Sequence, residues 1–270
     1  MKAKIEESVK AITSKVSFKP EIGIILGTGL GMLAKDVEPV GVIPYQEIPN
    51  FPIPTVESHS GRFILGKLSG KKVCVMQGRF HYYEGYGMQE ITHPVRVMKG
   101  LGIKILIVSN ACGGLNPQFQ AGDIMVITDH INLLGDNPLR GVTDPDLGPR
   151  FPDMYNCYDR ELVALTEKVA LDLNLPLRRG VYVATMGPNL ETGAEYRFFR
   201  NCGGDAVGMS TVPEVIVARQ IGIKVLGLSV VTDMGLPDAM RPVNLAEILR
   251  IAGNAEPKLT ALVREVVKRI

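Results

Sequence analysis

The sequence has little of what marks a membrane, nucleic-acid-binding or secreted protein. Its 270 residues carry a net charge of only +2, so no basic face of the size that nucleic acids need is implied. The longest apolar runs have the length of strands, well short of the roughly 20 residues that span a bilayer. The first residues mix both charges without an apolar segment, so no secretory signal is expected. We expect a cytoplasmic protein with no nucleic-acid partner and no membrane partner.

Cysteine and histidine are also scarce, with four of each. The cysteines are Cys74, Cys112, Cys157 and Cys202. No two of them form a C-x-x-C pair, which argues against a zinc ribbon or a redox pair, and we expect reduced, buried thiols. No two histidines and a carboxylate stand at metal-ligand spacing, so we predict no metal. The isolated His93 and His130 are predicted to be structural side chains.

Apolar residues make up 46% of the chain, in short runs that alternate with helical patterns. The predicted strands are residues 22–26, 73–76, 103–108, 123–128, 180–185, 206–208 and 225–231. The predicted helices are residues 5–16, 159–173, 191–200, 214–221 and 244–270, the last interrupted near Pro257. The proline-rich segment 37–62 and the segment 132–158 are predicted to be mostly irregular. This alternation predicts one α/β domain over residues 1–270, with a mixed, mostly parallel sheet covered by helices on both faces.

Polar, glycine-rich segments stand where predicted strands end. They are residues 27–31, 77–86, 109–114, 187–191, 208–214 and 232–233. In sheets of this class, ligands gather at the carboxyl ends of the strands. Six segments of this kind favour a binding site more strongly than any one of them alone.

The segment after residues 73–76 contains Arg79 and His81, two positions apart. In extended backbone such side chains point to the same side, so a guanidinium and an imidazole would face one spot. That arrangement suits an oxyanion such as phosphate, which Arg holds by paired hydrogen bonds. A solvated basic loop is the alternative interpretation.

The glycine run at residues 27–31 is not a dinucleotide-binding motif, because Met32 stands where its last glycine would be. The backbone amides and the Thr28 hydroxyl would instead cradle a single phosphate, or form a plain tight turn. His59, in the proline-rich segment, is a candidate gate for that phosphate.

Three further segments each allow two interpretations. Asn110 would bond a sugar hydroxyl or belong to a close-packed turn. Glu191 would accept two N–H bonds from a purine edge or stabilise the first turn of a helix. Ser210 and Thr211 would receive an anion at a helix N-terminus or cap that helix.

Taken together, these segments resemble the trimeric purine nucleoside phosphorylases, a family related to the methylthioadenosine phosphorylases. The resemblance extends from Ile24 to the last helix. Among the runs that carry it are Gly27-Thr-Gly-Leu-Gly31, Gln77-Gly-Arg-Phe-His-Tyr-Tyr-Glu-Gly85, Asn110-Ala-Cys-Gly-Gly-Leu-Asn116 and Gly208-Met-Ser-Thr-Val-Pro-Glu-Val215. It implies a twisted, distorted barrel-like sheet surrounded by helices, assembled as a homotrimer.

The resemblance also implies a role for each matching residue. Phosphate would be bound by Thr28, His59, Arg79, His81, the Ala111 amide and Ser210. The ribose would contact Tyr83, Met209, Leu245 and a neighbouring subunit's copy of Phe151. The base would contact Asn110, Leu190, Glu191, Val207, Gly208 and Asp233. His81, Glu191 and Asp233 would carry the catalysis, with inorganic phosphate as co-substrate and no cofactor.

The implied reaction, part of purine salvage, is the reversible phosphorolysis of purine ribonucleosides or 2′-deoxyribonucleosides to the free base and the sugar 1-phosphate. Asp233 stands where many relatives have Asn, and an ionised Asp only accepts hydrogen bonds, which favours a 6-amino group. Glu191 favours the N1–H of inosine or guanosine. We expect inosine and guanosine to be substrates, with some tolerance of adenosine.

Two other functions stay open. Leu245 stands where many relatives have a His that contacts the ribose 5′-OH, and an apolar side chain there suits a methylthioadenosine phosphorylase. A nucleoside-binding protein without turnover is an alternative of another class, although every residue of the implied phosphate site is present.

Overall fold

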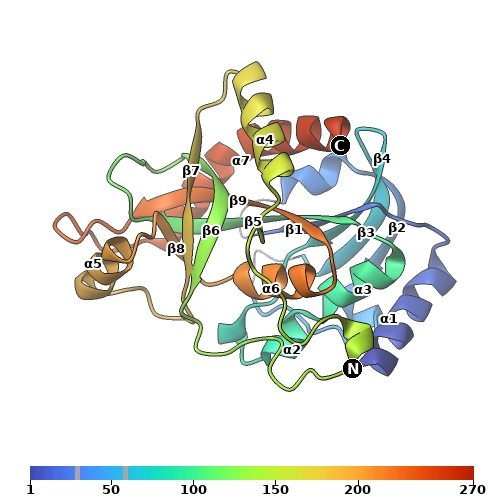
Figure 1. The fold of residues 1–270 in the computed structure, drawn as a ribbon. Helices are drawn as coiled ribbons and strands as arrows, with labels where there is room; N and C mark the ends of the chain where they lie inside the picture. Colours follow the sequence, from blue (N-terminus) through green and yellow to red (C-terminus); the bar gives the residue numbers. More distant parts are fainter. Residues whose placement is uncertain (28–30, 57–59) are drawn as a thin grey trace.

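The computed structural model describes residues 1–27, 31–56 and 60–270 of the chain. A central sheet has helices on both of its faces (Figure 1). The strands are β1 (Ile22–Leu26), β2 (Glu38–Pro44), β3 (Arg62–Leu68), β4 (Lys71–Gln77), β5 (Ile105–Gly114), β6 (Ile124–Asn132), β7 (Leu177–Ala184), β8 (Ala206–Gly208) and β9 (Lys224–Met234). The α-helices are α1 (Lys2–Lys15), α2 (Met88–Ile91), α3 (His93–Leu101), α4 (Arg160–Asp172), α5 (Gly193–Asn201), α6 (Val212–Gln220) and α7 (Leu245–Arg269).

The sheet closes on itself at one end. Its nine strands within the described residues follow the order β2-β3-β4-β1-β5-β8-β7-β6-β9, and β5 also pairs with β9. That extra pairing joins β5, β8, β7, β6 and β9 into a ring, while β1 to β4 extend from it. Parallel and antiparallel pairs are mixed, with β1, β4, β5 and β9 all parallel to their neighbours in that group. The predicted mixed, distorted barrel-like sheet is confirmed.

Two apolar cores lie on the two faces of the sheet. On one face, α1, α3 and α6 cover the sheet, and side chains such as Met98 of α3 and Val215 of α6 belong to the core. On the other face, α4 and α7 pack together and contribute side chains such as Val169 and Leu262 to the core. Each fully buried side chain of this kind contributes about 1.5–3 kcal/mol of transfer free energy, so both faces hold the strands in place.

The segment 37–62 was predicted to be mostly irregular, and its first part forms a strand instead. It contains β2, an edge strand that pairs antiparallel with β3 and has mostly exposed side chains. Its prolines fit an edge, because Pro39 lies at a shift in the strand register and Pro44 is the last residue. Exposure and proline together removed the apolar pattern that predicts a strand. The strand β3 was not predicted either, although most of its side chains are buried.

Helix α7 was predicted to be interrupted near Pro257, and it runs through that residue without a break. The proline ring is exposed, so the ring itself displaces no core side chain. The buried face of α7, including Ala255, Leu259 and Leu262, holds the helix against the sheet across this point. Tertiary packing therefore outweighs the cost of about 3 kcal/mol that proline brings to a helix interior.

One smaller difference concerns the exposure of the cysteines. Cys74, Cys112 and Cys157 are buried as expected, but Cys202, just after α5, is exposed. Among the described residues, no helix is both long and apolar enough to cross a bilayer.

Candidate active site

A cavity of about 330 Å³ lies at the carboxyl ends of β5, β8 and β9. Because β5 and β9 are parallel neighbours, their ends deliver side chains to the same place. Most of the residues predicted for the site line this cavity. They are Arg79, His81, Tyr83, Asn110, Ala111, Leu190, Glu191, Val207, Gly208, Met209, Ser210, Asp233 and Leu245.

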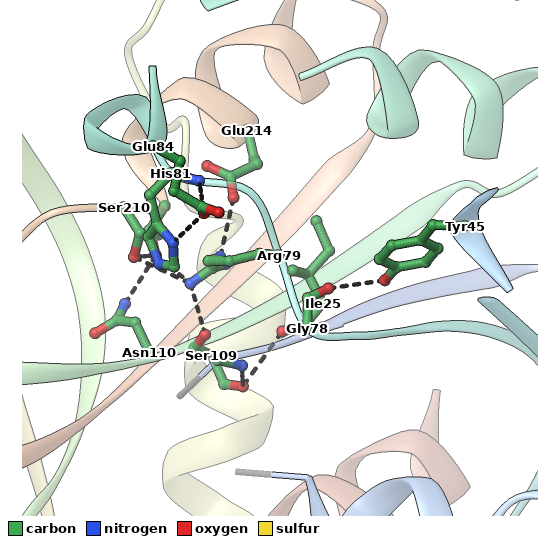
Figure 2. Close-up of polar contacts among 12 residues, drawn as sticks. Ile25, Tyr45, Gly78, Arg79, His81, Glu84, Ser109, Asn110, Ser210 and Glu214 are labelled. Carbon is green, nitrogen blue, oxygen red and sulfur yellow. Dashed lines mark hydrogen bonds and ion pairs between the residues drawn. The ribbon is translucent and has the colours of Figure 1, made fainter. Parts of the chain in front are cut away.

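Arg79 is a buried cation with an acidic partner (Figure 2). Its Nε donates to Glu214 Oε1 at 3.1 Å, and both side chains are almost fully buried. Its Nη1 donates to the Ser109 carbonyl at 2.8 Å and to Ser210 Oγ at 3.0 Å. Breaking a buried ion pair on one side costs about 3–5 kcal/mol, so Glu214 fixes the position of the guanidinium. The sequence prediction of a solvated basic loop at Arg79 was wrong.

The turn before α6 is strained. Thr211 has φ +72° and ψ −52°, and the Val212 amide donates to the Ser210 carbonyl at 2.8 Å. These angles describe a classic γ-turn, which is rare and costs free energy at a residue other than glycine. The Thr211 hydroxyl accepts from the Asn110 side-chain amide at 2.9 Å and from Arg79 at 3.3 Å. The turn therefore joins β5, the Arg79 segment and α6 at one point.

His81 and Glu84 form a hydrogen-bonded pair beside Arg79 (Figure 2). Nδ1 of His81 lies 2.9 Å from Glu84 Oε1, and the imidazole stacks on the Tyr83 ring at 4.7 Å. Burial lowers the pKa of His81, against the hydrogen bond to Glu84, which raises it. Burial opposes ionisation of Glu84, but hydrogen bonds from His81 and Thr55 lower its pKa to about 2. A neutral His81 then donates through Nδ1 and keeps its lone pair on Nε2.

Two carboxyl groups also line the cavity. Asp233 accepts from the Thr232 hydroxyl at 2.9 Å, and Glu191 accepts from the Thr185 hydroxyl at 3.0 Å. Burial and the nearby Glu191 raise the pKa of Asp233, and the Thr232 hydrogen bond opposes this rise. Burial and both carboxylates also raise the pKa of Tyr196, which lines the same wall.

Apolar side chains also line the cavity that holds the Arg79 and His81 pair and the two carboxyl groups. Met209 packs against Gly187, in the loop before α5. Gly187 has φ +66°, and a Cβ atom at this position would lie 2.3 Å from the Met209 sulfur. Leu245, the first residue of α7, is 67% exposed and lines the rim with Ile248. The cavity thus offers hydrogen-bonding groups of opposite charge and an apolar surface for a flat or ring-shaped ligand.

Comparison with known proteins identifies the family. Residues 21–268 match the sequence pattern of the family described as the phosphorylase superfamily. The chain is 49% identical over 267 residues to purine nucleoside phosphorylase 1 of Bacillus subtilis (strain 168), covering 99% of this chain and 98% of that one. The chain belongs to the purine nucleoside phosphorylase family.

Solved structures of this family agree in the fold. The purine nucleoside phosphorylase of Schistosoma mansoni in complex with inosine has a TM-score of 0.94 at 42% identity, covering 99% of this chain and 96% of that one. The complex of the schistosome protein with adenosine has a TM-score of 0.94 at 43% identity, covering 98% and 96% of the two chains.

For two predicted site residues the structure describes nothing, and a third does not line the cavity. Thr28 and His59 lie outside the described residues, so their predicted contacts with phosphate stay predictions. Phe151 is 86% exposed in the long segment after β6 and does not line the cavity of its own chain. Its predicted contact with a neighbouring subunit also stays a prediction.

Two of the alternative interpretations were wrong. Glu191 does not lie in the first turn of a helix, because α5 begins at Gly193 and the Thr192 cap pairs with Glu195 instead. Thr211 is the N-cap residue of α6 but makes no side-chain cap. The hydroxyls of Ser210 and Thr211 bond to Arg79 rather than to the amides of the helix.

Several residues that build the site were not predicted to do so. Glu214, Glu84 and Ser109 hold Arg79 and His81, and Tyr196 lines the wall beside Glu191. The spacing of His81 and Glu84 is that of a capping box, a signal that could have been found in the sequence. The pairing of Arg79 with Glu214 spans 135 positions, and no local pattern encodes it.

Proposed function

We propose that this protein catalyses the reversible phosphorolysis of purine nucleosides, with the cavity as its active site. The observation that supports this most is the separation of the lining groups. Arg79, His81 and Ser210 form a group suited to an oxyanion, while Glu191 and Asp233 form a group suited to the N–H donors of a purine. The purine nucleoside phosphorylase of Bacillus subtilis is named for this class of substrate, and the schistosome enzyme is solved in complex with inosine and with adenosine.

Phosphate would bind among Arg79, His81, Ser210 and the Ala111 amide. Arg79 supplies positive charge from a position fixed by Glu214. The Nε2 atom of the neutral His81 accepts a hydrogen bond from the P–OH group of a hydrogen phosphate dianion. Thr28 and His59 are proposed to complete this subsite. The binding energy holds the nucleophile in place before the reaction, which removes much of the entropic barrier.

The sugar would lie between the phosphate and the base. Tyr83, Met209 and Leu245 give it an apolar and aromatic contact surface, and Asn110, which precedes Ala111 in β5, lines the same cavity. The exposed Phe151 is proposed to reach the sugar of a neighbouring subunit within a homotrimer. This assembly and a cytoplasmic location are parts of the proposal.

The base would lie against Leu190, Val207 and Gly208, with its polar edge toward the two carboxyl groups. Glu191 would accept from N1–H of a 6-oxopurine. Asp233 would stand beside N7, where negative charge develops as the bond to the sugar lengthens. Because burial and Glu191 raise the pKa of Asp233, its carboxyl group is suited to donate a proton to a hydrogen bond at N7.

The chemistry follows from this arrangement. A phosphate oxygen forms a bond to C1′ while the C1′–N9 bond breaks and its electron pair passes to the base. The base takes up one proton, which overall is the proton that the hydrogen phosphate dianion brings in. It leaves as the neutral purine, with the sugar 1-phosphate dianion as the other product. Ribonucleosides and 2′-deoxyribonucleosides share this chemistry. We propose that no metal and no cofactor take part, and that phosphate is a co-substrate only.

The division of the cavity can be tested through Ser210. We expect base release from inosine to require phosphate, and Ser210→Ala to lower kcat/KM for phosphate about tenfold while KM for inosine changes little. Ser229→Ala is the matched control, because Ser229 is a buried serine of β9 that does not line the cavity. Base release without phosphate, or equal effects of the two variants, would contradict the proposal.

Leu245 favours a second candidate, the phosphorolysis of 5′-methylthioadenosine. Its exposed apolar side chain at the rim suits a methylthio group better than a hydroxyl. The curated relatives are named for purine nucleosides, so this candidate stands second. A higher kcat/KM for 5′-methylthioadenosine than for inosine would reverse the order.

A further inference from the structure

A second cavity, of about 620 Å³, lies behind one wall of the active site. The two cavities have six lining residues in common, namely Leu190, Glu191, Tyr196, Thr232, Asp233 and Ile248. None of the phosphate-side residues Arg79, His81 and Ser210 lines the second cavity. The second cavity therefore adjoins only the part of the active site that carries the two acidic groups.

The lining of the second cavity is mainly apolar beyond this shared wall. Met234, Met240, Val243 and Ile251 contribute to it from β9, from the segment before α7 and from α7 itself. Met240 is 45% exposed and Val243 is 38% exposed, so apolar side chains stand open to solvent around it. Methionine adapts its shape to different apolar partners, which suits a site for a variable group.

The orientation of the base decides what reaches this cavity. A purine whose N1 faces Glu191 and whose N7 faces Asp233 has C6 between the two carboxyl groups. Both carboxyl groups belong to the shared wall. A group attached at C6 therefore points toward the second cavity, while the sugar at N9 stays on the phosphate side.

We propose that the second cavity holds the substituent of N6-substituted adenosines, and that the enzyme cleaves nucleosides whose 6-amino group carries an alkyl or arylalkyl chain. This inference rests on the proposed function. A secondary amine at C6 keeps one N–H, which donates to Asp233, and its substituent lies over Met240 and Ile251. The aspartate at position 233 suits that N–H as an acceptor, whereas a 6-oxo group offers none.

The reaction on such a substrate is the same substitution. The C1′–N9 bond breaks with its electron pair going to N9, a phosphate oxygen bonds to C1′, and the base leaves as the N6-substituted adenine after taking up a proton. The 6-substituent takes no part in bond making. Its burial contributes binding energy only, so it affects kcat/KM through the fit of the second cavity.

The test compares N6-benzyladenosine with inosine, each with phosphate, on the full chain. Ile251→Trp fills the second cavity from a residue that does not line the first. We expect it to lower kcat/KM for N6-benzyladenosine by about tenfold or more and to leave that for inosine within about twofold. Ala121→Phe, at an exposed residue of the same cavity, is the second variant and should act in the same direction.

Three results would overturn the inference. Cleavage of inosine without measurable cleavage of N6-benzyladenosine would overturn it and leave the proposed function intact. Cleavage of N6-benzyladenosine that neither Ile251→Trp nor Ala121→Phe weakens would place the substituent elsewhere. Failure to cleave inosine as well would instead remove the proposed function, and this inference with it.

Discussion

Asp233 and Glu191 bring two carboxyl groups to the same wall of the cavity, and they favour different bases. An ionised Asp233 accepts from a 6-amino group, while Glu191 accepts from the N1–H that adenosine does not have. Burial and Glu191 raise the pKa of Asp233, so a protonated Asp233 also donates to a 6-oxo group. The base preference therefore depends on whether the Asp233 carboxyl group carries a proton.

Asp233→Asn tests this dependence. Asn donates to O6 without needing a proton, so the ratio of kcat/KM for inosine to that for adenosine should rise about tenfold, the value of one hydrogen bond. The measurement is a pair of steady-state assays on both nucleosides. Asp238→Asn, a change at an exposed aspartate outside the active site, should leave the ratio unchanged. An unchanged ratio in Asp233→Asn would contradict the role of Asp233.

At the residue scale, the sequence predicted the groups that face the cavity better than the groups behind them. Arg79 and His81 stand two positions apart after a strand, and this local pattern indicated an anion site. Glu214 fixes Arg79 from α6, far along the chain, and its role appears only when the fold brings them together. Long-range partners of a buried cation leave no periodic signal.

At the element scale, His93 links the start of α3 to α1. Its Nε2 lies 2.9 Å from Ser8 Oγ, and its ring packs edge-on against Phe51. Burial, helped by Lys4 and Arg96, lowers the pKa of His93 to about 4. The prediction that His93 is a structural side chain agrees with this contact between two helices.

The lowered pKa of His93 makes this contact depend on pH. The unfolded chain takes up the proton first as pH falls below 6.5, so stability is complete above that pH and is lost as pH falls toward 4. Between pH 7 and pH 5 we expect the protein to lose about 2 kcal/mol more unfolding free energy than His93→Gln loses. Urea unfolding at the two pH values measures both losses. Equal losses would contradict the assignment.

Pro257 provides a second prediction at the element scale. It lies exposed inside α7, where it withholds the hydrogen bond that an amide would give to the Gly253 carbonyl. Pro257→Ala should raise the unfolding free energy by about 1–2 kcal/mol. Alanine favours the helix, but removing proline also gives the unfolded chain more conformational entropy, which offsets part of that gain. Urea unfolding at neutral pH checks the value. A loss of stability would show that the proline ring packs favourably.

Element boundaries show where sequence patterns suffice and where they do not. The buried strand β1 was predicted with its observed ends, because every residue in it is apolar and buried. β2 was not predicted, because an edge strand with exposed side chains and two prolines lacks that pattern. β5 runs on to Gly114, through residues that looked like a turn, because pairing with β9 supplies the order that their own propensities lack.

At the scale of the whole molecule, Phe151 tests the proposed trimer. Its 86% exposure in one chain means that Phe151→Ala removes little packing within the subunit. We expect an unchanged melting temperature, a mass in solution of three chains, and KM for inosine raised about tenfold. Phe198→Ala, at an exposed phenylalanine of α5, serves as the control. A monomeric mass, or equal KM values for wild type and Phe151→Ala, would contradict the assembly.

The fold as a whole follows from alternating apolar strands and helices, but the closure of the sheet does not. Alternation predicts a layered α/β protein. The ring forms because β5 and β9 are long enough to pair along their whole length and because β6 returns antiparallel to β9. These pairings lie far apart in sequence, and the resemblance to a known family indicated them where periodicity could not.

The central claim is that a phosphate oxygen attacks C1′ of a purine nucleoside in the cavity. Phosphate labelled with ¹⁸O at all four oxygens, incubated with inosine and the enzyme, tests it directly by mass spectrometry of the sugar product. We expect ribose 1-phosphate that retains all four labelled oxygens, together with free hypoxanthine. Release of free ribose, which is the product of attack by water, or no release of hypoxanthine at all, would contradict it.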